Sequence, residues 1–339
     1  MTIQQIHEAV FGERYAFLRE NRHLGNKLIF LSVGGSHAYG TNTDTSDLDI
    51  RGCALNSKSE LLGLSNFEQV TDSATDTVIY SFNKLVNLLL NCNPNTIEML
   101  GCKKEHYLLL TDIGSSLIEN RKLFLSRRAV NSFGGYANQQ LRRLENALAR
   151  DRLPQAQQEE HILKSMQGAL KSFEERHVSL GRSIYLYTGD SLRDGLDREI
   201  FADIHLEGCP VRSFNSLMND LSNVVATYEK LGRRNRKKDD AHLNKHAMHL
   251  IRLYLMCLDI LEKEEIVTYR GKEHDLLMSI RSGAYQNDDG TYRKEFFDMV
   301  NTLEKRLDYA KENTSLPDSP DTKRVEEFVM DVNRRALDV

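Results

Sequence analysis

The spacing of hydrophobic and polar positions changes character about a third of the way along the chain. Apolar residues three and four apart in residues 3 to 20 predict an opening amphipathic helix. Short runs rich in β-branched and aromatic residues then predict three strands, at 27 to 33, 48 to 55 and 76 to 82. In the second of these, the side chains of Asp47, Asp49 and Arg51 are expected to share one face because successive residues of a strand alternate.

Helical patterns dominate the rest of the chain. Two short helices are expected after the third strand, one that Pro94 stops and one with Thr96 as its N-cap. From about residue 115 the strand signals fade, and helical periodicity recurs in 135 to 150, 155 to 180, 213 to 231, 240 to 264 and 292 to 312. We therefore expect an α/β (α+β) head with a small mixed sheet in residues 1–120, and a mostly α-helical C-terminal domain in residues 121–339.

Composition narrows the class of protein. The 339 residues are enough for two domains, and a net charge of -4 gives no overall cationic field for nucleic acid, so any such binding has to be local. Five scattered cysteines without a Cys-x-x-Cys pair argue against a disulfide framework or a cysteine-rich zinc site. The N-terminus lacks the apolar run of a signal peptide, and the longest apolar stretches fall short of the roughly 20 residues that span a bilayer. A cytoplasmic protein with no membrane partner is expected.

One stretch carries the clearest chemical signal. Gly34, Gly35 and Ser36 follow the first predicted strand, and Asp47 and Asp49 open the second. Glycines allow a close backbone approach to an anion, and Ser36 adds a hydroxyl donor. Two aspartates on one face of a strand supply the hard oxygen ligands that divalent metal ions prefer. The combination favours phosphoryl or nucleotidyl transfer with bound metal.

A third carboxylate would complete such a site. Asp76 opens the third predicted strand and is the first candidate, with Asp72 as the alternative. Arg51 is able either to neutralise phosphate or to pair with a carboxylate, and we favour the second role.

The motif resembles the DNA polymerase beta type nucleotidyltransferase superfamily and, within it, the predicted nucleotidyltransferases of the RlaP type. The resemblance rests on Gly35-Ser36-His37-Ala38-Tyr39-Gly40, Ser46-Asp47-Leu48-Asp49-Ile50-Arg51-Gly52, Asp76, Tyr80-Ser81, Lys84, Asn93-Pro94-Asn95, Glu98 and Leu100. Looser matches follow at Lys245-His246, His249, Arg252-Leu253, Leu276, Ile280-Arg281 and Gly283. Where many members of the superfamily carry arginine after Gly-Ser, this chain carries His37.

The resemblance implies an enzyme that moves a nucleoside monophosphate from an NTP to an acceptor and releases pyrophosphate. It implies Asp47, Asp49 and Asp76 as catalytic residues and ligands of two Mg²⁺ or Mn²⁺ ions. The expected nucleotide-binding residues are Gly34, Gly35, Ser36, His37 and Ser46, together with Lys245, His249 and Arg252, which are spaced four and three apart on the polar face of a predicted helix.

The acceptor is left open by the sequence. A basic run at 233 to 238 is able to contact the phosphates of RNA or tRNA, or serves only as a solvated surface. The alternatives are a binding module of the same fold that performs no chemistry, and an enzyme that nucleotidylates a protein.

Overall fold

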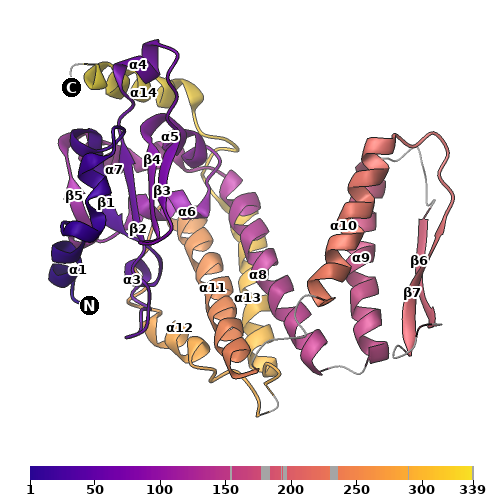
Figure 1. Cartoon of the computed structure of the whole chain (residues 1–339). Coiled ribbons are helices and arrows are strands. Elements are labelled where there is room, and N and C mark those ends of the chain that lie inside the picture. The colour runs from indigo at the N-terminus through magenta and orange to yellow at the C-terminus, as the bar shows by residue number, and fades with distance from the viewer. Residues whose placement is uncertain are drawn as a thin grey trace. The chain divides into compact units, whose positions relative to one another are not determined.

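The computed structural model divides the chain into two compact units. It describes residues 1–152, 155–176, 184–191, 193, 197–229, 236–288 and 290–337. The first unit comprises Met1–Gln139, Met248–Tyr285 and Lys294–Val339, and the second comprises Gln140–Ala247 and Gln286–Arg293. The C-terminal helices that follow residue 285 thus belong mainly to the unit that contains the sheet (Figure 1). The expected division into a head in residues 1–120 and a helical domain in residues 121–339 stays a prediction.

The first unit is built on a mixed sheet, as expected, but the sheet has five strands where three were predicted, and the two at Gln69–Asp72 and Tyr107–Leu110 were missed. Its strands are β1 (Leu28–Val33), β2 (Ile50–Ala54), β3 (Gln69–Asp72), β4 (Thr77–Ser81) and β5 (Tyr107–Leu110). Their order is β3-β4-β2-β1-β5, with β2 and β4 parallel and every other pair antiparallel. All six residues of β1 are buried, which is typical of a strand covered on both faces.

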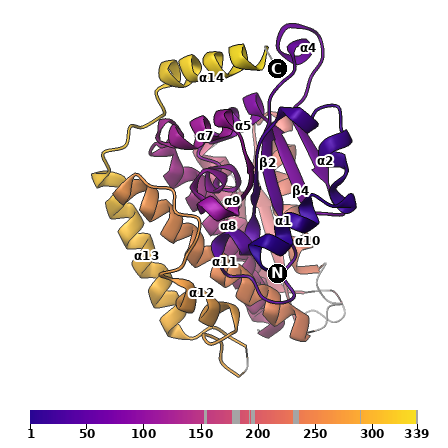
Figure 2. The same cartoon turned by 90° about the vertical axis from the view of Figure 1, so that its left-hand side faces the viewer.

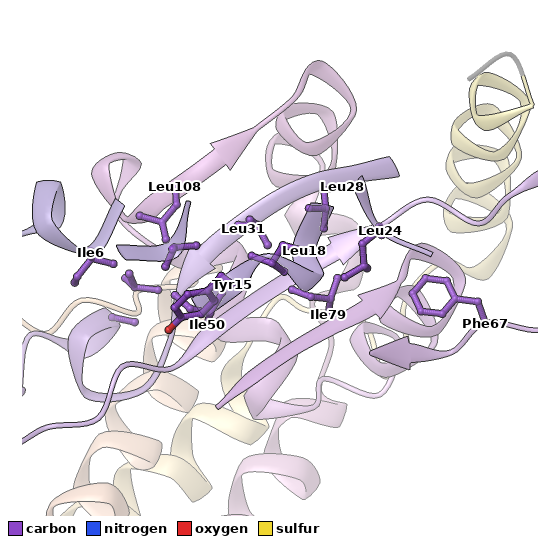
Figure 3. Close-up of a cluster of buried hydrophobic side chains, with 14 of the residues drawn as sticks. Ile6, Tyr15, Leu18, Leu24, Leu28, Leu31, Ile50, Phe67, Ile79 and Leu108 are labelled. Atoms are coloured by element: carbon purple, nitrogen blue, oxygen red, sulfur yellow. The ribbon is translucent and has the colours of Figure 1, made fainter. Parts of the chain in front are cut away.

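The N-terminal segment covers one face of this sheet. It contains α1 (Ile3–Val10), a 3₁₀ turn at Glu13–Tyr15 and α2 (Phe17–Glu20), so the single helix expected over 3 to 20 is interrupted. A capping box formed by Thr2 and Gln5 starts α1. Ile6 of α1 packs with Leu31 of β1 and other apolar residues of the sheet in one buried cluster (Figure 3). Burial of this apolar surface is the main force holding the segment to the sheet.

Short helices join the strands or follow the last of them. They are α3 (Gly35–Tyr39), α4 (Lys58–Leu62), α5 (Phe82–Leu89), α6 (Pro94–Ile97) and α7 (Asp112–Glu119). The expectation that Thr96 caps a helix after Pro94 is wrong: Asn93 is the N-cap of α6, its side chain accepts from Asn95 N–H, and Pro94 occupies the first turn. Proline fits that position because its missing N–H has no helical partner there.

Among the described residues, five further helices lie wholly or partly in the first unit: α8 (Arg128–Arg152), α11 (Arg236–Lys263), α12 (His274–Arg281), α13 (Lys294–Asn313) and α14 (Thr322–Ala336). The part of α11 from 247 to 261 is buried apart from the half-buried His249 and Leu255. The predicted polar face is therefore absent from this part of α11, because the first unit surrounds the helix on all sides. At the C-terminus α14 packs beside α5, where Asn333 Nδ2 donates to Asn83 Oδ1 at 3.0 Å (Figure 2).

The second unit contains α9 (Gln155–Arg176), α10 (Val211–Glu229) and a hairpin of β6 (Ile184–Asp190) and β7 (Arg198–Ile204). One face of the hairpin packs on the two helices through Ile184 and Leu186. The expected mostly helical character of the C-terminal region is confirmed, but this hairpin was missed. The alternation in Ile184-Tyr185-Leu186-Tyr187 is the signal that could have revealed it.

Candidate active site

Three segments of the first unit meet at one edge of the sheet. β1 runs antiparallel to β2, and β2 runs parallel to β4, so the residues that follow β1 and those that precede β2 and β4 are neighbours. Backbone hydrogen bonds join them. Gly34 N–H donates to Asp49 O at 2.8 Å, and Ile50 N–H donates to Asp76 O at 3.2 Å. The glycine turn and two of the predicted carboxylates are thus brought together from three places in the sequence.

The Asp49 side chain lies against the glycine turn. At Gly35, whose φ is 53°, a Cβ would clash with Asp49 Oδ2 and come within 2.8 Å of Asp49 Cγ. At Gly34 a Cβ would come within 3.2 Å of Asp49 Cβ. A side chain at Gly35 is therefore excluded by the approach of the carboxylate and disfavoured by the left-handed backbone, whereas at Gly34 a Cβ would only be tightly packed. The sequence suggested these glycines because they allow an anion to approach the backbone closely. The structure adds a second reason, the packing of the Asp49 side chain against them.

Arg51 joins the two carboxylates. Its Nη2 donates to Asp49 Oδ1 at 3.0 Å and lies 3.3 Å from Asp76 Oδ1. Its Nη1 donates to the backbone oxygens of Asp76 at 2.5 Å and Ile50 at 3.0 Å. Arg51 therefore pairs with carboxylates, the role favoured from the sequence, and the guanidinium marks a place where one cation reaches both Asp49 and Asp76.

Asp76 and Asp72 have different surroundings. Asp76 has a φ of 45°, a left-handed conformation that aspartate tolerates better than most residues, and its side chain is 59% exposed. Asp72 Oδ2 instead accepts from Thr75 N–H at 2.9 Å and Thr75 Oγ1 at 2.6 Å, which closes the turn between β3 and β4. Of the two candidates for the third carboxylate, Asp76 is the one beside Asp49.

Asp47 lies outside the strand on which it was expected. β2 begins at Ile50, so both aspartates belong to the loop before it, and Asp47 is exposed. Nearby, Ser46 Oγ accepts from Thr43 N–H at 2.8 Å and from Arg281 Nη2 at 3.3 Å. Ser46 thus organises the loop, and Arg281 of α12 holds it. Arg281 lies 235 residues from Ser46 in the sequence, and only looser matches of the resemblance included it.

Ser36 and His37 lie in α3. Ser36 is half-buried and its carbonyl accepts from Thr41 N–H at 2.9 Å. His37 is only 8% exposed. Burial lowers its pKa, the N-terminal amino group lowers it further, and a hydrogen bond with the Ser46 backbone opposes both. The side chain of His37 is therefore a poor source of fixed positive charge for a triphosphate.

The predicted row on α11 is divided. Arg252 is 5% exposed, donates to Glu98 Oε2 at 3.2 Å and stacks on the Tyr39 ring, with Cζ 3.7 Å from the ring centroid. His249 is half-buried and meets the same ring edge-on at 6.3 Å. Lys245 is exposed and belongs to the second unit. Arg252 and His249 thus contact the end of α3 from inside the first unit.

The donor atoms at the sheet edge fit a divalent metal ion in their chemistry. Carboxylate oxygens are the ligands that Mg²⁺ and Mn²⁺ prefer, and Arg51 shows that Asp49 and Asp76 can be reached by one cation. Among the described residues, however, no three His, Cys, Asp or Glu side chains gather closely enough to hold a metal ion. The described residues therefore do not bring Asp47 together with Asp49 and Asp76 in one three-carboxylate group.

The first unit thus combines a mixed sheet with a glycine turn and two aspartates at one edge of it. The family model described as "RlaP: RNA repair pathway DNA polymerase beta family" matches residues 6–187, more than half of the chain. The chain belongs to this RlaP family, as its motifs predicted. No curated protein and no solved structure matches it.

Two other expectations from the sequence concern a membrane and nucleic acid. None of the described helices has the length and apolar composition needed to cross a bilayer. The basic run at 233 to 238 lies in part outside the described residues, which resume at 236.

Proposed function

We propose that this chain transfers a nucleoside monophosphate from an NTP to a hydroxyl group of an RNA end. The observation that supports the proposal best is the meeting of Gly35, Asp49 and Asp76 at one sheet edge in a member of a polymerase-beta-type family. The family description names RNA repair, which makes an RNA end the first acceptor to test.

The glycine turn is proposed to hold the triphosphate. Gly34 and Gly35 carry no side chain to keep phosphate oxygens away from the backbone, and Ser36 adds a hydroxyl at the start of α3. Of the other predicted nucleotide contacts, His37 and Ser46 support the loop before β2, and Arg252 is engaged with Glu98. Contacts from Lys245 and His249 stay predictions.

The three aspartates are proposed to act on the reacting groups. Asp47 and Asp49 would hold the metal ions that bind the triphosphate, and Asp76, which is more exposed than Asp49, accepts the proton of the acceptor hydroxyl. The acceptor oxygen attacks the α-phosphorus, a new P–O bond forms, and the bond to the bridging oxygen breaks. Pyrophosphate leaves with the electron pair of that bond.

Two Mg²⁺ or Mn²⁺ ions are proposed as cofactors. Bound by these carboxylates, they would neutralise charge that develops on the phosphate oxygens. Without that neutralisation the carboxylates would repel the triphosphate, since like charges a few ångströms apart raise the energy of the complex.

Two alternatives use the same surface. A module that only binds nucleotide or RNA would gain nothing from aspartates that face a polyanion, which disfavours it. An enzyme that nucleotidylates a protein would use the same aspartates and differs only in the acceptor.

The test is transfer of label from each α-labelled NTP in the presence of Mg²⁺, with and without total RNA. Wild type is compared with Asp47→Ala/Asp49→Ala and with Asp44→Ala, which removes an exposed aspartate from the same loop. We expect RNA labelling by wild type and Asp44→Ala, and a loss of at least about a hundredfold in the double variant.

Each other outcome has a distinct meaning. Equal labelling by all three proteins would show that the sheet edge is not the site. Label on protein in the absence of RNA identifies the nucleotidylating enzyme, and NTP binding without any transfer identifies the binding module.

A further inference from the structure

The Arg51 guanidinium occupies the position between the two inner carboxylates of the proposed site. One nitrogen, Nη2, contacts both Asp49 Oδ1 at 3.0 Å and Asp76 Oδ1 at 3.3 Å. The other terminal nitrogen is anchored on the backbone oxygens of Ile50 and Asp76. The group is thus held by two carboxylates and two carbonyls, all from the ends of two parallel strands.

This placement follows from the sheet. In the pairing of the parallel strands β2 and β4, Ile50 lies beside Thr77, so Asp49 and Asp76 stand one residue before a paired position on adjacent strands. Arg51 follows on β2, and its side chain, 22% exposed, turns back to the strand ends. The planar fork of arginine suits such divided contacts, whereas lysine offers one compact charge.

A divalent ion at the same two carboxylates would meet the positive charge of Arg51 at close range. Like charges a few ångströms apart near a protein surface repel each other. The guanidinium and the ion therefore compete for Asp49 and Asp76.

We propose that Arg51 is a positioning residue that holds Asp49 and Asp76 together as their internal counter-cation and is displaced when a divalent ion binds. The inference rests on the proposed function, because it concerns the ion required there. It predicts that removing the positive charge strengthens ion binding, the reverse of what loss of a merely structural residue would do.

The experiment is titration of the full chain with Mn²⁺, with free Mn²⁺ followed by electron paramagnetic resonance. Arg51→Met is compared with wild type, with Arg51→Lys and with Arg14→Met. Arg14 is the matched control because it donates to the Ala74 carbonyl, two residues before Asp76, at 2.7 Å. We expect Arg51→Met to bind Mn²⁺ about tenfold more tightly. Arg51→Lys and Arg14→Met are expected to stay within about twofold of wild type.

Unchanged or weaker Mn²⁺ binding by folded Arg51→Met would overturn the inference. If wild type binds no Mn²⁺, the metal-dependent function itself fails, which separates the two proposals. If Arg51→Met does not fold, NMR spectra of wild type labelled with ¹⁵N-arginine replace the titration. The Arg51 side-chain signal is identified as the one that is missing from the spectrum of Arg51→Lys. Addition of Mg²⁺ is expected to shift this signal, and an unmoved signal contradicts the displacement.

Discussion

Two arginine–carboxylate clusters in the first unit use the same chemical groups in opposite surroundings. Arg51 bridges Asp49 and Asp76 at the sheet edge, where these side chains are 22%, 20% and 59% exposed. Arg252 pairs with Glu98 in the interior, where the two side chains are 6% and 10% exposed. A ligand can reach the first cluster but not the second, so accessibility separates the carboxylates proposed to react from the structural one.

The interior cluster joins distant parts of the unit. Tyr39 Oη donates to both carboxylate oxygens of Glu98, at 2.8 and 2.9 Å, and burial raises the Tyr39 pKa well above its ordinary value. Thr268 Oγ1 donates to the Glu98 carbonyl at 2.6 Å, and Arg270 N–H donates to the Tyr39 carbonyl at 2.9 Å. Glu98 and Tyr39 thus connect the end of α3, and with it the glycine turn, to the chain after α11.

The largest predicted effect of a substitution is on the interior cluster. Arg252→Met leaves Glu98 buried without its cation, and we expect the free energy of unfolding to fall by about 3 to 5 kcal/mol. Arg306→Met, which breaks the more exposed pair of Arg306 and Glu262, is the control and should cost about 1 kcal/mol or less. Chemical denaturation measures both, and equal losses would remove the distinction between interior and exposed pairs.

At the sheet edge we expect loss of activity instead of stability. Asp76→Asn should lower the rate of nucleotidyl transfer by at least about a hundredfold with little change in unfolding, because the side chain is exposed and proposed to meet the reactants. Asp72→Asn should retain activity and weaken the turn closed by Thr75 by about 1 kcal/mol. Steady-state rates and denaturation midpoints of the two variants decide which aspartate is the third carboxylate. The reverse pattern would assign that role to Asp72.

A smaller effect is expected from the glycine turn. Gly35→Ala puts a methyl group against Asp49 and into a left-handed backbone, so we expect a loss of about 1 to 2 kcal/mol in stability and weaker NTP binding. Gly134→Ala is the matched control. Gly134 lies in α8, and a Cβ added there would meet no atom within 4 Å. That variant should be neutral or slightly more stable. Calorimetry with NTP and thermal unfolding test both, and unaltered Gly35→Ala would show that Asp49 relaxes away freely.

The smallest effect is a dependence of stability on pH. Burial is the first cause that lowers the pKa values of His37 and His106 below their ordinary value of 6.5. The unfolded chain therefore binds more protons than the folded chain near that pH, and stability falls as the pH drops below about 6.5. Melting temperatures of wild type and His106→Gln at pH 7.5 and 5.5 measure this. The variant should lose less on acidification, and an equal loss would assign the effect to other groups.

The local patterns of the chain predicted three of the five strands of the sheet in the first unit. The runs at 27 to 33 and 76 to 82 are strands because β-branched and aromatic residues favour a buried, pleated surface. The resemblance predicted a family that is confirmed over residues 6–187. The predicted strand ends were less accurate: Asp47 and Asp49 both lie before β2, because pairing with a neighbouring strand decides where a strand begins.

The sequence did not reveal which polar residues would be enclosed. Arg252 has helical spacing from Lys245 and was expected on a polar face, yet packing of α11 within the first unit buries it against Glu98, 154 residues away. The same limit applies to Arg281, which holds the loop at Ser46 from 235 residues away. Spacing along a helix says which side chains are neighbours but not what lies opposite them.

By itself the sequence determined which groups are available for chemistry: a glycine turn and three aspartates. Tertiary structure decided their use. It brought Asp49 and Asp76 to one nitrogen of Arg51, directed Asp72 into a turn and buried Arg252. Local composition sets which elements form, whereas the pairing of strands and the enclosure of helices set which charges meet one another and which meet solvent.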